Sequence, residues 1–216
     1  MTEQEIFSRI DHTLLKANSS WDEIQKLCSE AVKYKTASAC IPPSYVKSAF
    51  NSYGSDLNIC TVIGFPLGYS VKEAKLKEAE IALADGANEI DMVINIGDLK
   101  NGNHKKVEEE ISAMKKIAGS KILKVIVETC YLTTEEKINL CRIVSQTGAN
   151  YIKTSTGFGT SGAAQEDIIL FKEHISPGVK IKASGGIKTR GDLEAFIKLG
   201  CSRIGTSSAI TALENR

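Results

Sequence analysis

Short β-type runs alternate with amphipathic helical stretches along the whole of this 216-residue chain. A brief apolar run bounded by turn residues is typical of a buried strand, and apolar residues recurring about every three to four positions are typical of a helix with one buried face. These two periods predict eight strands. They span Ile10–Thr13, Ala37–Ile41, Ile59–Phe65, Glu89–Asn95, Ile122–Glu128, Tyr151–Ser155, Lys180–Ser184 and Arg203–Thr206.

The segments between the strands carry the helical period. Buried faces are formed by Ile24, Leu27, Cys28, Ala31 and Val32, by Val107, Ile111, Met114 and Ala118, and by Ile138, Cys141 and Val144. Ser20, Ser70 and Thr133 are each followed three residues later by glutamate, which is the pattern of a capping box at a helix start. Gly86, Gly148 and Gly200 are predicted to end helices in positive-φ turns.

Strand–helix alternation implies parallel strands joined by right-handed crossovers. Eight such units within about 200–250 residues favour a single-domain α/β fold, the (β/α)8 TIM barrel, over residues 1–216. The four prolines are dispersed and no linker divides the chain, so one domain is predicted. A doubly wound open sheet is the alternative, but it usually carries a glycine-rich dinucleotide loop after an early strand, and this sequence has none.

The composition of the chain argues against several classes of function. The formal net charge is +1 and there is no basic stripe with interleaved aromatic residues, so no nucleic-acid partner is expected. The polar N-terminus does not resemble a signal peptide, and no apolar run is long enough to span a bilayer. The six cysteines form no C-x-x-C pair, which argues against zinc and disulfides and favours a cytoplasmic protein.

Three charged residues interrupt otherwise apolar strands: Asp91, Lys153 and Lys182. A lone strand lysine is usually an outward, solvated residue. Because side chains alternate between the two faces of a strand, however, these three can all point into one barrel cavity. A buried cation beside a second cation loses protonation more easily, and a neutral amine attacks an aldehyde to give an iminium ion. The pattern therefore favours Schiff-base chemistry.

Glycines and serines after the last strands indicate a phosphate site. Gly185 and Gly186 follow the seventh predicted strand, and Ser207 and Ser208 follow the eighth. Loops at these positions are where β/α barrels bind phosphate through backbone N–H groups. Gly157, after the sixth strand, offers another N–H group. The competing interpretation is that Gly-Gly is a tight turn and Ser-Ser a helix cap.

Six segments together resemble the deoxyribose-phosphate aldolase family over nearly the whole chain, from Asp11 to about Ser208. They are Asp11–Leu15, Gly64–Gly68, Glu89–Gly97, Leu123–Thr129, Lys153–Phe158 and Lys182–Ile187. The last two, Lys-Thr-Ser-Thr-Gly-Phe and Lys-Ala-Ser-Gly-Gly-Ile, are the most specific in this order and separation.

The resemblance implies a class I aldolase, a carbon–carbon lyase that reversibly cleaves 2-deoxy-D-ribose 5-phosphate into acetaldehyde and D-glyceraldehyde 3-phosphate in deoxyribonucleoside catabolism. It implies Lys153 as the Schiff-base lysine, Lys182 as the second lysine and Asp91 as the acid/base group. Asp11 and Lys124 match the polar partners of this relay.

The same resemblance places the substrate phosphate at Gly157, Gly185, Gly186, Ser207 and Ser208. No cofactor and no metal ion are implied, because the iminium serves as the electron sink. A homodimer is a reasonable expectation for a barrel of this size.

The sequence also departs from the family pattern. Pro42-Pro43 stands where members commonly have Asn-Pro, and Phe158 where some have lysine, so substrate affinity is in question more than reaction type. Cys40 is expected to be a packed thiol, and Glu128 has no assigned role. Two alternatives stay open: a related lyase for another phosphosugar, and a non-catalytic barrel that senses sugar phosphates.

Overall fold

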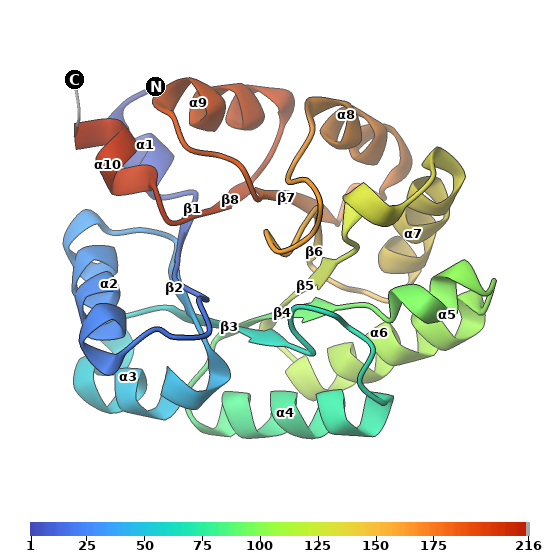
Figure 1. The fold of residues 1–216 in the computed structure, drawn as a ribbon, viewed down its shortest axis with the longest axis horizontal. Helices are drawn as coiled ribbons and strands as arrows, with labels where there is room; N and C mark the ends of the chain where they lie inside the picture. Colours follow the sequence, from blue (N-terminus) through green and yellow to red (C-terminus); the bar gives the residue numbers. More distant parts are fainter. Residues whose placement is uncertain (215–216) are drawn as a thin grey trace.

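Eight parallel strands hydrogen-bond in chain order, and the eighth pairs with the first, so the sheet closes into a barrel (Figure 1). The strands are β1 (Ile10–Thr13), β2 (Ser38–Ile41), β3 (Ile59–Ile63), β4 (Glu89–Val93), β5 (Ile122–Ile126), β6 (Tyr151–Lys153), β7 (Lys180–Ser184) and β8 (Arg203–Thr206). The computed structural model describes residues 1–214. The predicted (β/α)8 TIM barrel is confirmed, and residues 215 and 216 of the predicted domain lie outside the described residues.

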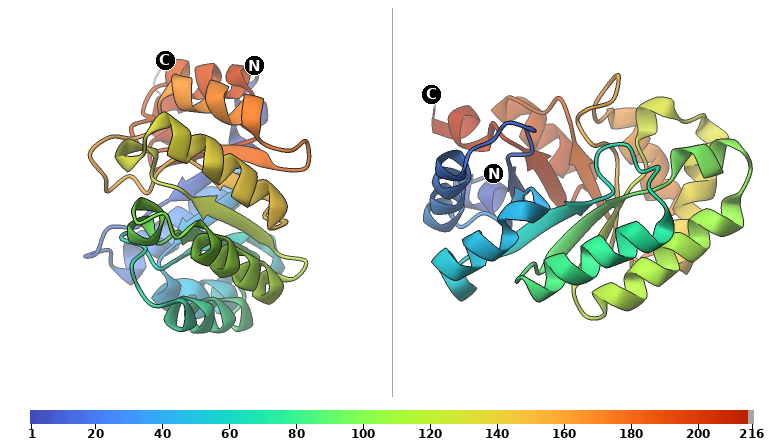
Figure 2. Two further views of the ribbon diagram at one scale, coloured as in Figure 1. Left: turned by 90° about the vertical axis from the view of Figure 1, so that its right-hand side faces the viewer. Right: turned by 60° about the horizontal axis from the view of Figure 1, so that its bottom comes forward.

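Helices follow the strands and surround the barrel (Figure 2). They are α1 (Glu3–Phe7), α2 (Trp21–Tyr34), α3 (Val46–Tyr53), α4 (Lys72–Ala84), α5 (Ile96–Lys100), α6 (His104–Ala118), α7 (Thr134–Gln146), α8 (Gln165–His174), α9 (Arg190–Leu199) and α10 (Ala209–Glu214). Short 3-10 turns lie at η1 (Pro43–Tyr45), η2 (Gly54–Asp56) and η3 (Thr129–Tyr131). Among residues 1–214, no helix is both long and apolar enough to cross a membrane.

Two of the three predicted capping boxes are confirmed. The side chains of Ser20 and Thr133 each accept a hydrogen bond from the backbone N–H of the glutamate three residues later. The side chain of that glutamate accepts in turn from the backbone N–H of the cap residue. The prediction at Ser70 is wrong, because Val71 is still extended and α4 begins one residue later without a side-chain cap. Gly86, Gly148 and Gly200 all have positive φ, as predicted.

Four strands end earlier than the sequence predicts. β3, β4, β5 and β6 each stop two residues before the predicted end, and β2 starts at Ser38 rather than Ala37. The trailing residues leave the closed sheet and turn into the loops at its carboxyl end. Two of these loops begin with buried apolar residues, Ile94 and Val127, so periodicity could not mark the strand end there.

The apolar core lies between the strands and the helices. Outward-facing strand residues such as Ile90, Met92 and Val125 pack with helix residues such as Ile111 and Met114 in one large cluster. The inner face of the barrel instead holds charged side chains, together with a small apolar group of Cys40, Cys60 and Val62. Helices stabilise the barrel from outside, which leaves its centre free for polar groups.

Candidate active site

Strand register brings charged residues from separate segments to neighbouring positions around the barrel. Asp91 of β4 is paired with Lys124 of β5. Lys153 of β6 is paired with Lys182 of β7, and Lys182 is paired in turn with Arg203 of β8. Because alternate residues of a strand share a face, the inward residues of adjacent strands form a continuous band of charge inside the barrel.

The Asp91 carboxylate is the centre of this band. Its Oδ2 atom lies 2.8 Å from Lys153 Nζ and 2.6 Å from Lys182 Nζ, so both amines contact the same oxygen. Its Oδ1 atom accepts from Lys124 Nζ at 2.8 Å and from the Cys60 thiol at 3.2 Å. The structure therefore brings together the two lysines and the aspartate that the sequence singled out.

Asp11, Glu89 and Arg203 complete what we call the central charge cluster. Asp11 contacts the ammonium of Lys182 and the guanidinium of Arg203, and accepts from Ser38 Oγ at 2.7 Å. Glu89 lies 2.6 Å from Lys124 Nζ and 2.9 Å from Arg203 Nη1. The cluster consists of Asp11, Glu89, Asp91, Lys124, Lys153, Lys182 and Arg203.

Within the cluster, three carboxylates face four cationic side chains. Lys124 contacts the carboxylates of Asp11, Glu89 and Asp91. Lys182 and Arg203 contact two carboxylates each. Among the described residues, Asp91 is the only carboxylate that Lys153 contacts. Lys153 and Lys182 contact the same Asp91 atom, Oδ2. The cluster therefore has one more cationic side chain than it has carboxylates, and Lys153 is the cation with the fewest carboxylate partners.

For Asp91 and Lys182, neighbouring opposite charges outweigh the effect of burial on the pKa. Burial by itself raises the pKa of Asp91, but Lys124, Lys153 and Lys182 together hold it well below its ordinary value. Burial likewise opposes the lysine cation, yet Asp11 and Asp91 raise the pKa of Lys182. Asp91 is therefore a carboxylate and Lys182 an ammonium ion at neutral pH.

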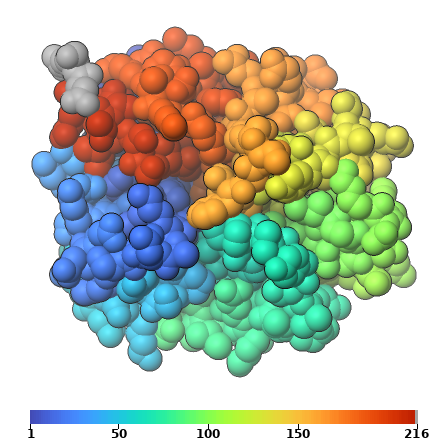
Figure 3. Space-filling model, viewed as in Figure 1, coloured from blue at the N-terminus to red at the C-terminus, as the bar shows by residue number. Residues whose placement is uncertain are grey.

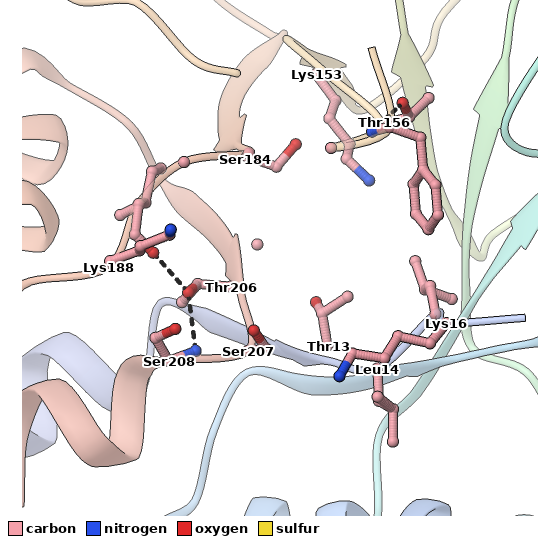
Figure 4. Close-up of a pocket in the computed structure, with 17 residues that line it drawn as sticks. Thr13, Leu14, Lys16, Lys153, Thr156, Ser184, Lys188, Thr206, Ser207 and Ser208 are labelled. Carbon is pink, nitrogen blue, oxygen red and sulfur yellow. Dashed lines mark hydrogen bonds between the residues drawn. The ribbon is translucent and has the colours of Figure 1, made fainter. Parts of the chain in front are cut away.

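A cavity of about 230 Å³ opens above Lys153 at the carboxyl end of the strands. All five residues predicted to hold phosphate line it: Gly157, Gly185, Gly186, Ser207 and Ser208. In Figure 4 the Lys153 amine points into this space, with Ser184, Ser207 and Ser208 around it. The chain after β6, orange in Figure 3, lies across the centre of the same face of the barrel.

Two further lysines at the cavity were missed by the sequence argument. Lys16 follows β1, Lys188 follows β7, and both line the cavity with exposed side chains (Figure 4). Among residues 1–214, no aspartate or glutamate lines it. Their position in the sequence could have identified them, because each lysine lies just beyond the carboxyl end of a strand. The cavity is therefore suited to an anionic ligand.

The residues that depart from the family pattern lie beside this cavity. Phe158 is 55% exposed and packs edge-on against Phe65, with ring centroids 5.3 Å apart. Pro42 and Pro43 line a neighbouring pocket that also touches Phe158. Phe158 thus places an apolar ring at the mouth, where Lys16 and Lys188 supply the positive charge.

Cys40 is fully buried and packs with Cys60 and Val62. The neighbouring Cys60 thiol, together with the charges of Lys182 and Lys153, lowers the pKa of the Cys40 thiol despite its burial. Two groups of residues have donor atoms close enough to share a metal ion, Cys40 with Cys60 and Asp91, and Asp11 with Cys60 and Glu89. The carboxylates of both groups belong to the central charge cluster, where lysine and arginine side chains already pair with them.

Comparison with known families agrees with this geometry. The model of the DeoC/LacD family of aldolases matches residues 6–209. The chain is 59% identical over 214 residues to the deoxyribose-phosphate aldolase of Clostridium botulinum (strain Alaska E43 / Type E3), covering 99% of this chain and 97% of that protein. It is 53% identical over 215 residues to the enzyme of the same name from Streptococcus pyogenes serotype M4 (strain MGAS10750), covering 100% and 96%.

Solved structures show the same similarity. The deoxyribose-phosphate aldolase of Aeropyrum pernix, described as a unique tetramer, superposes with a TM-score of 0.92 at 33% identity. That match covers 99% of this chain and 91% of the other.

Proposed function

The chain belongs to the DeoC/LacD family of aldolases, and we propose that it is a deoxyribose-phosphate aldolase acting through a Schiff base at Lys153. The observation that carries the proposal is the contact of Lys153 and Lys182 with one Asp91 oxygen, at 2.8 and 2.6 Å. Two amines beside one carboxylate give a nucleophile and a proton donor within reach of one substrate molecule.

The first step is attack of the Lys153 amine on the C1 aldehyde of 2-deoxy-D-ribose 5-phosphate. Loss of water from the carbinolamine gives an iminium ion. Lys153 fits this role because it lines the cavity and has the fewest carboxylate partners in the central charge cluster. An uncharged amine is required, since an ammonium ion has no electron pair to donate.

The carbon–carbon bond breaks next. The C3 hydroxyl gives up its proton, the C2–C3 electron pair moves to the iminium to form an enamine, and D-glyceraldehyde 3-phosphate leaves. The enamine then accepts a proton at C2, and hydrolysis releases acetaldehyde and the Lys153 amine. The Lys182 ammonium and the Asp91 carboxylate are the groups proposed to relay these protons through water, held in place by Asp11 and Lys124.

The phosphate end of the substrate is proposed to lie near Gly157, Gly185, Gly186, Ser207 and Ser208. Three lysines and no carboxylate line this cavity among the described residues, which favours a dianion. Lys16 and Lys188 supply charge at its mouth. A sensor that binds sugar phosphates would use the same lysines at the mouth, but it would have no use for Lys153 and Lys182 beside Asp91.

Borohydride reduction in the presence of acetaldehyde tests the proposal. We expect mass spectrometry of peptides to find a reduced two-carbon adduct on Lys153 and none in Lys153→Met, whose turnover falls more than about 10⁴-fold. Lys180→Met is the matched control, because Lys180 lies on β7 with an exposed side chain. An adduct on another lysine, or one that persists in Lys153→Met, would contradict the mechanism.

Donor choice separates the two enzyme alternatives. Synthesis from D-glyceraldehyde 3-phosphate with acetaldehyde is expected to be much faster than with dihydroxyacetone or its phosphate. The reverse preference would indicate a lyase for a different phosphosugar.

We also propose a cytoplasmic protein, because all six cysteines are free thiols. A homodimer stays a prediction, which sedimentation velocity measures directly.

A further inference from the structure

Glu128 has an unusual backbone at the edge of the cavity. It lies just after β5 with φ 56° and ψ 67°, in the left-handed region that residues other than glycine seldom adopt. Lys35 is the other non-glycine residue with positive φ among residues 1–214, and it ends a helix, where this conformation is common. Glu128 instead lies between β5 and the 3-10 turn η3, so its conformation requires another cause.

Hydrogen bonds on both sides fix Glu128 to the strand that carries Lys153. The preceding residue, Val127, donates its N–H to Lys153 O at 3.0 Å. The following residue, Thr129, donates its N–H to Thr154 O at 2.9 Å. The left-handed turn at Glu128 lies between these two bonds, and its side chain reaches Thr156 two residues farther along the loop.

The Glu128 carboxylate is 2% exposed, and every hydrogen bond that the structure gives it is to a neutral group. It accepts from Thr156 N at 3.2 Å and from the Thr156 hydroxyl. Thr156 Oγ1 in turn accepts from Phe158 N at 3.0 Å. A side chain at Gly159 would lie 3.2 Å from the Glu128 carboxyl carbon, so the loop packs directly on this carboxylate.

We propose that Glu128 is a positioning residue that fixes the turn Thr156–Gly157–Phe158 and thereby shapes the end of the cavity that holds the substrate phosphate. Thr156, Gly157 and Phe158 all line the cavity. Gly157 has φ 88°, so its N–H direction depends on how its neighbours are held. That the ligand is the substrate phosphate rests on the proposed function. The structural part of the inference requires only that an anion binds at this turn.

The carboxylate also sets the polarity of the Thr156 hydroxyl. The Thr156 hydroxyl donates its one proton to Glu128 Oε2, and its oxygen accepts from Phe158 N. A glutamine at 128 has the same shape, but its amide can donate. With the amide nitrogen facing Thr156, the hydroxyl would lose its acceptor and turn its proton away from residue 128, so the turn would lose this hydrogen bond.

Glu128→Gln tests this inference by separating phosphate binding from chemistry. We expect the KM for 2-deoxyribose 5-phosphate to rise about tenfold, the equivalent of one lost hydrogen bond, while kcat changes less than about threefold. Turnover of unphosphorylated 2-deoxyribose and acetaldehyde trapping on Lys153 are expected to stay near wild type. Calorimetric titration with inorganic phosphate is expected to show a Kd about tenfold weaker in the variant.

Glu110→Gln is the matched control, because Glu110 is also buried but lies on α6, outside this cavity. Its phosphate Kd is expected to stay within about twofold of wild type. If Glu128→Gln does not fold, Thr156→Val removes the same hydrogen bond from the other partner and is expected to weaken phosphate binding similarly.

Unchanged KM and phosphate Kd in Glu128→Gln, or in Thr156→Val where Glu128→Gln does not fold, would overturn the inference. Failure of the proposed function gives a different result. Wild-type protein would then not cleave 2-deoxyribose 5-phosphate, while the phosphate titration would still report whether Glu128 fixes the turn.

Discussion

Two buried groups of charges in this barrel differ in how completely they are neutralised. In the central charge cluster, Asp91 contacts Lys124, Lys153 and Lys182. Between α4 and α6, Lys75 meets a single carboxylate, Glu110, at 2.8 Å, and also donates to Val93 O at 2.9 Å. The lysines compared between the two groups, Lys75 and Lys182, are equally buried, with side chains at most 1% exposed.

The pKa shifts of the two regions have opposite signs. In the cluster, neighbouring cations overcome burial and lower the pKa of Asp91. At the isolated pair, burial prevails: it raises the pKa of Glu110 and lowers the pKa of Lys75 despite their mutual attraction. A buried charge is thus stabilised when several opposite charges surround it, and one partner does not suffice.

This difference suits the two regions to different tasks. In the cluster, several opposite charges stabilise each carboxylate, and Lys153 shares its one carboxylate partner with Lys124 and Lys182. The Lys75–Glu110 pair instead connects α4, α6 and the end of β4, since Glu110 also accepts from Asn95 N at 3.2 Å. We therefore expect substitutions in the cluster to affect chemistry first and substitutions in the pair to affect stability first.

Among the substitutions that compare the two regions, Lys182→Leu is expected to have the largest effect. It removes the ammonium that contacts both Asp11 and Asp91, and with it the proposed proton donor. The kcat should fall by about 10²–10⁴-fold, the range for a lost general acid, while circular dichroism shows a folded barrel. Lys180→Met on the same strand is the control. Rates near wild type in Lys182→Leu would remove Lys182 from the mechanism.

Lys75→Met is expected to lower the free energy of unfolding by about 3–5 kcal/mol, because it leaves Glu110 buried without its cation. The kcat/KM of the folded protein should change less than about threefold. Urea denaturation and steady-state kinetics measure the two effects.

The double variant Lys75→Met/Glu110→Leu sharpens this test. Replacing both partners with apolar side chains removes the unpaired charge, so most of the lost stability should return. A double variant less stable than Lys75→Met would contradict the account of the pair.

Lowering the pH is expected to give the smallest difference in stability between the two regions. The folded-state pKa of Asp91 lies below its unfolded value, so its stabilising contribution is present above about pH 4 and is lost as the pH falls further. Burial raises the folded-state pKa of Glu110, so the folded state binds more protons there and this group contributes stability as the pH falls toward 4.

Glu110→Gln should therefore lose stability more steeply than wild type as the pH falls through the range in which glutamate titrates. Denaturant titrations across this range measure the slope. A shallower slope in Glu110→Gln would reverse the sign assigned to this carboxyl.

Most of the fold could be predicted because periodicity is local. The apolar positions Val107, Ile111 and Met114 mark a helix wherever it packs, and the structure buries all three on α6. Boundaries were harder where a buried loop continues an apolar strand. Glu128 and Ser155 were predicted as strand residues, but both lie beyond the strand end in the loops that line or support the cavity.

The sequence by itself determined the barrel and three of its inward charges, because strand alternation fixes the face on which Asp91, Lys153 and Lys182 lie. It could not determine which carboxylate each lysine meets, nor that Glu89 and Arg203 join them, because those contacts depend on register between strands far apart in the chain. Tertiary structure also decided that Lys16, Lys188 and the Glu128–Thr156 contact border the cavity. Loop geometry has no sequence period, so only the closed barrel brings these side chains together.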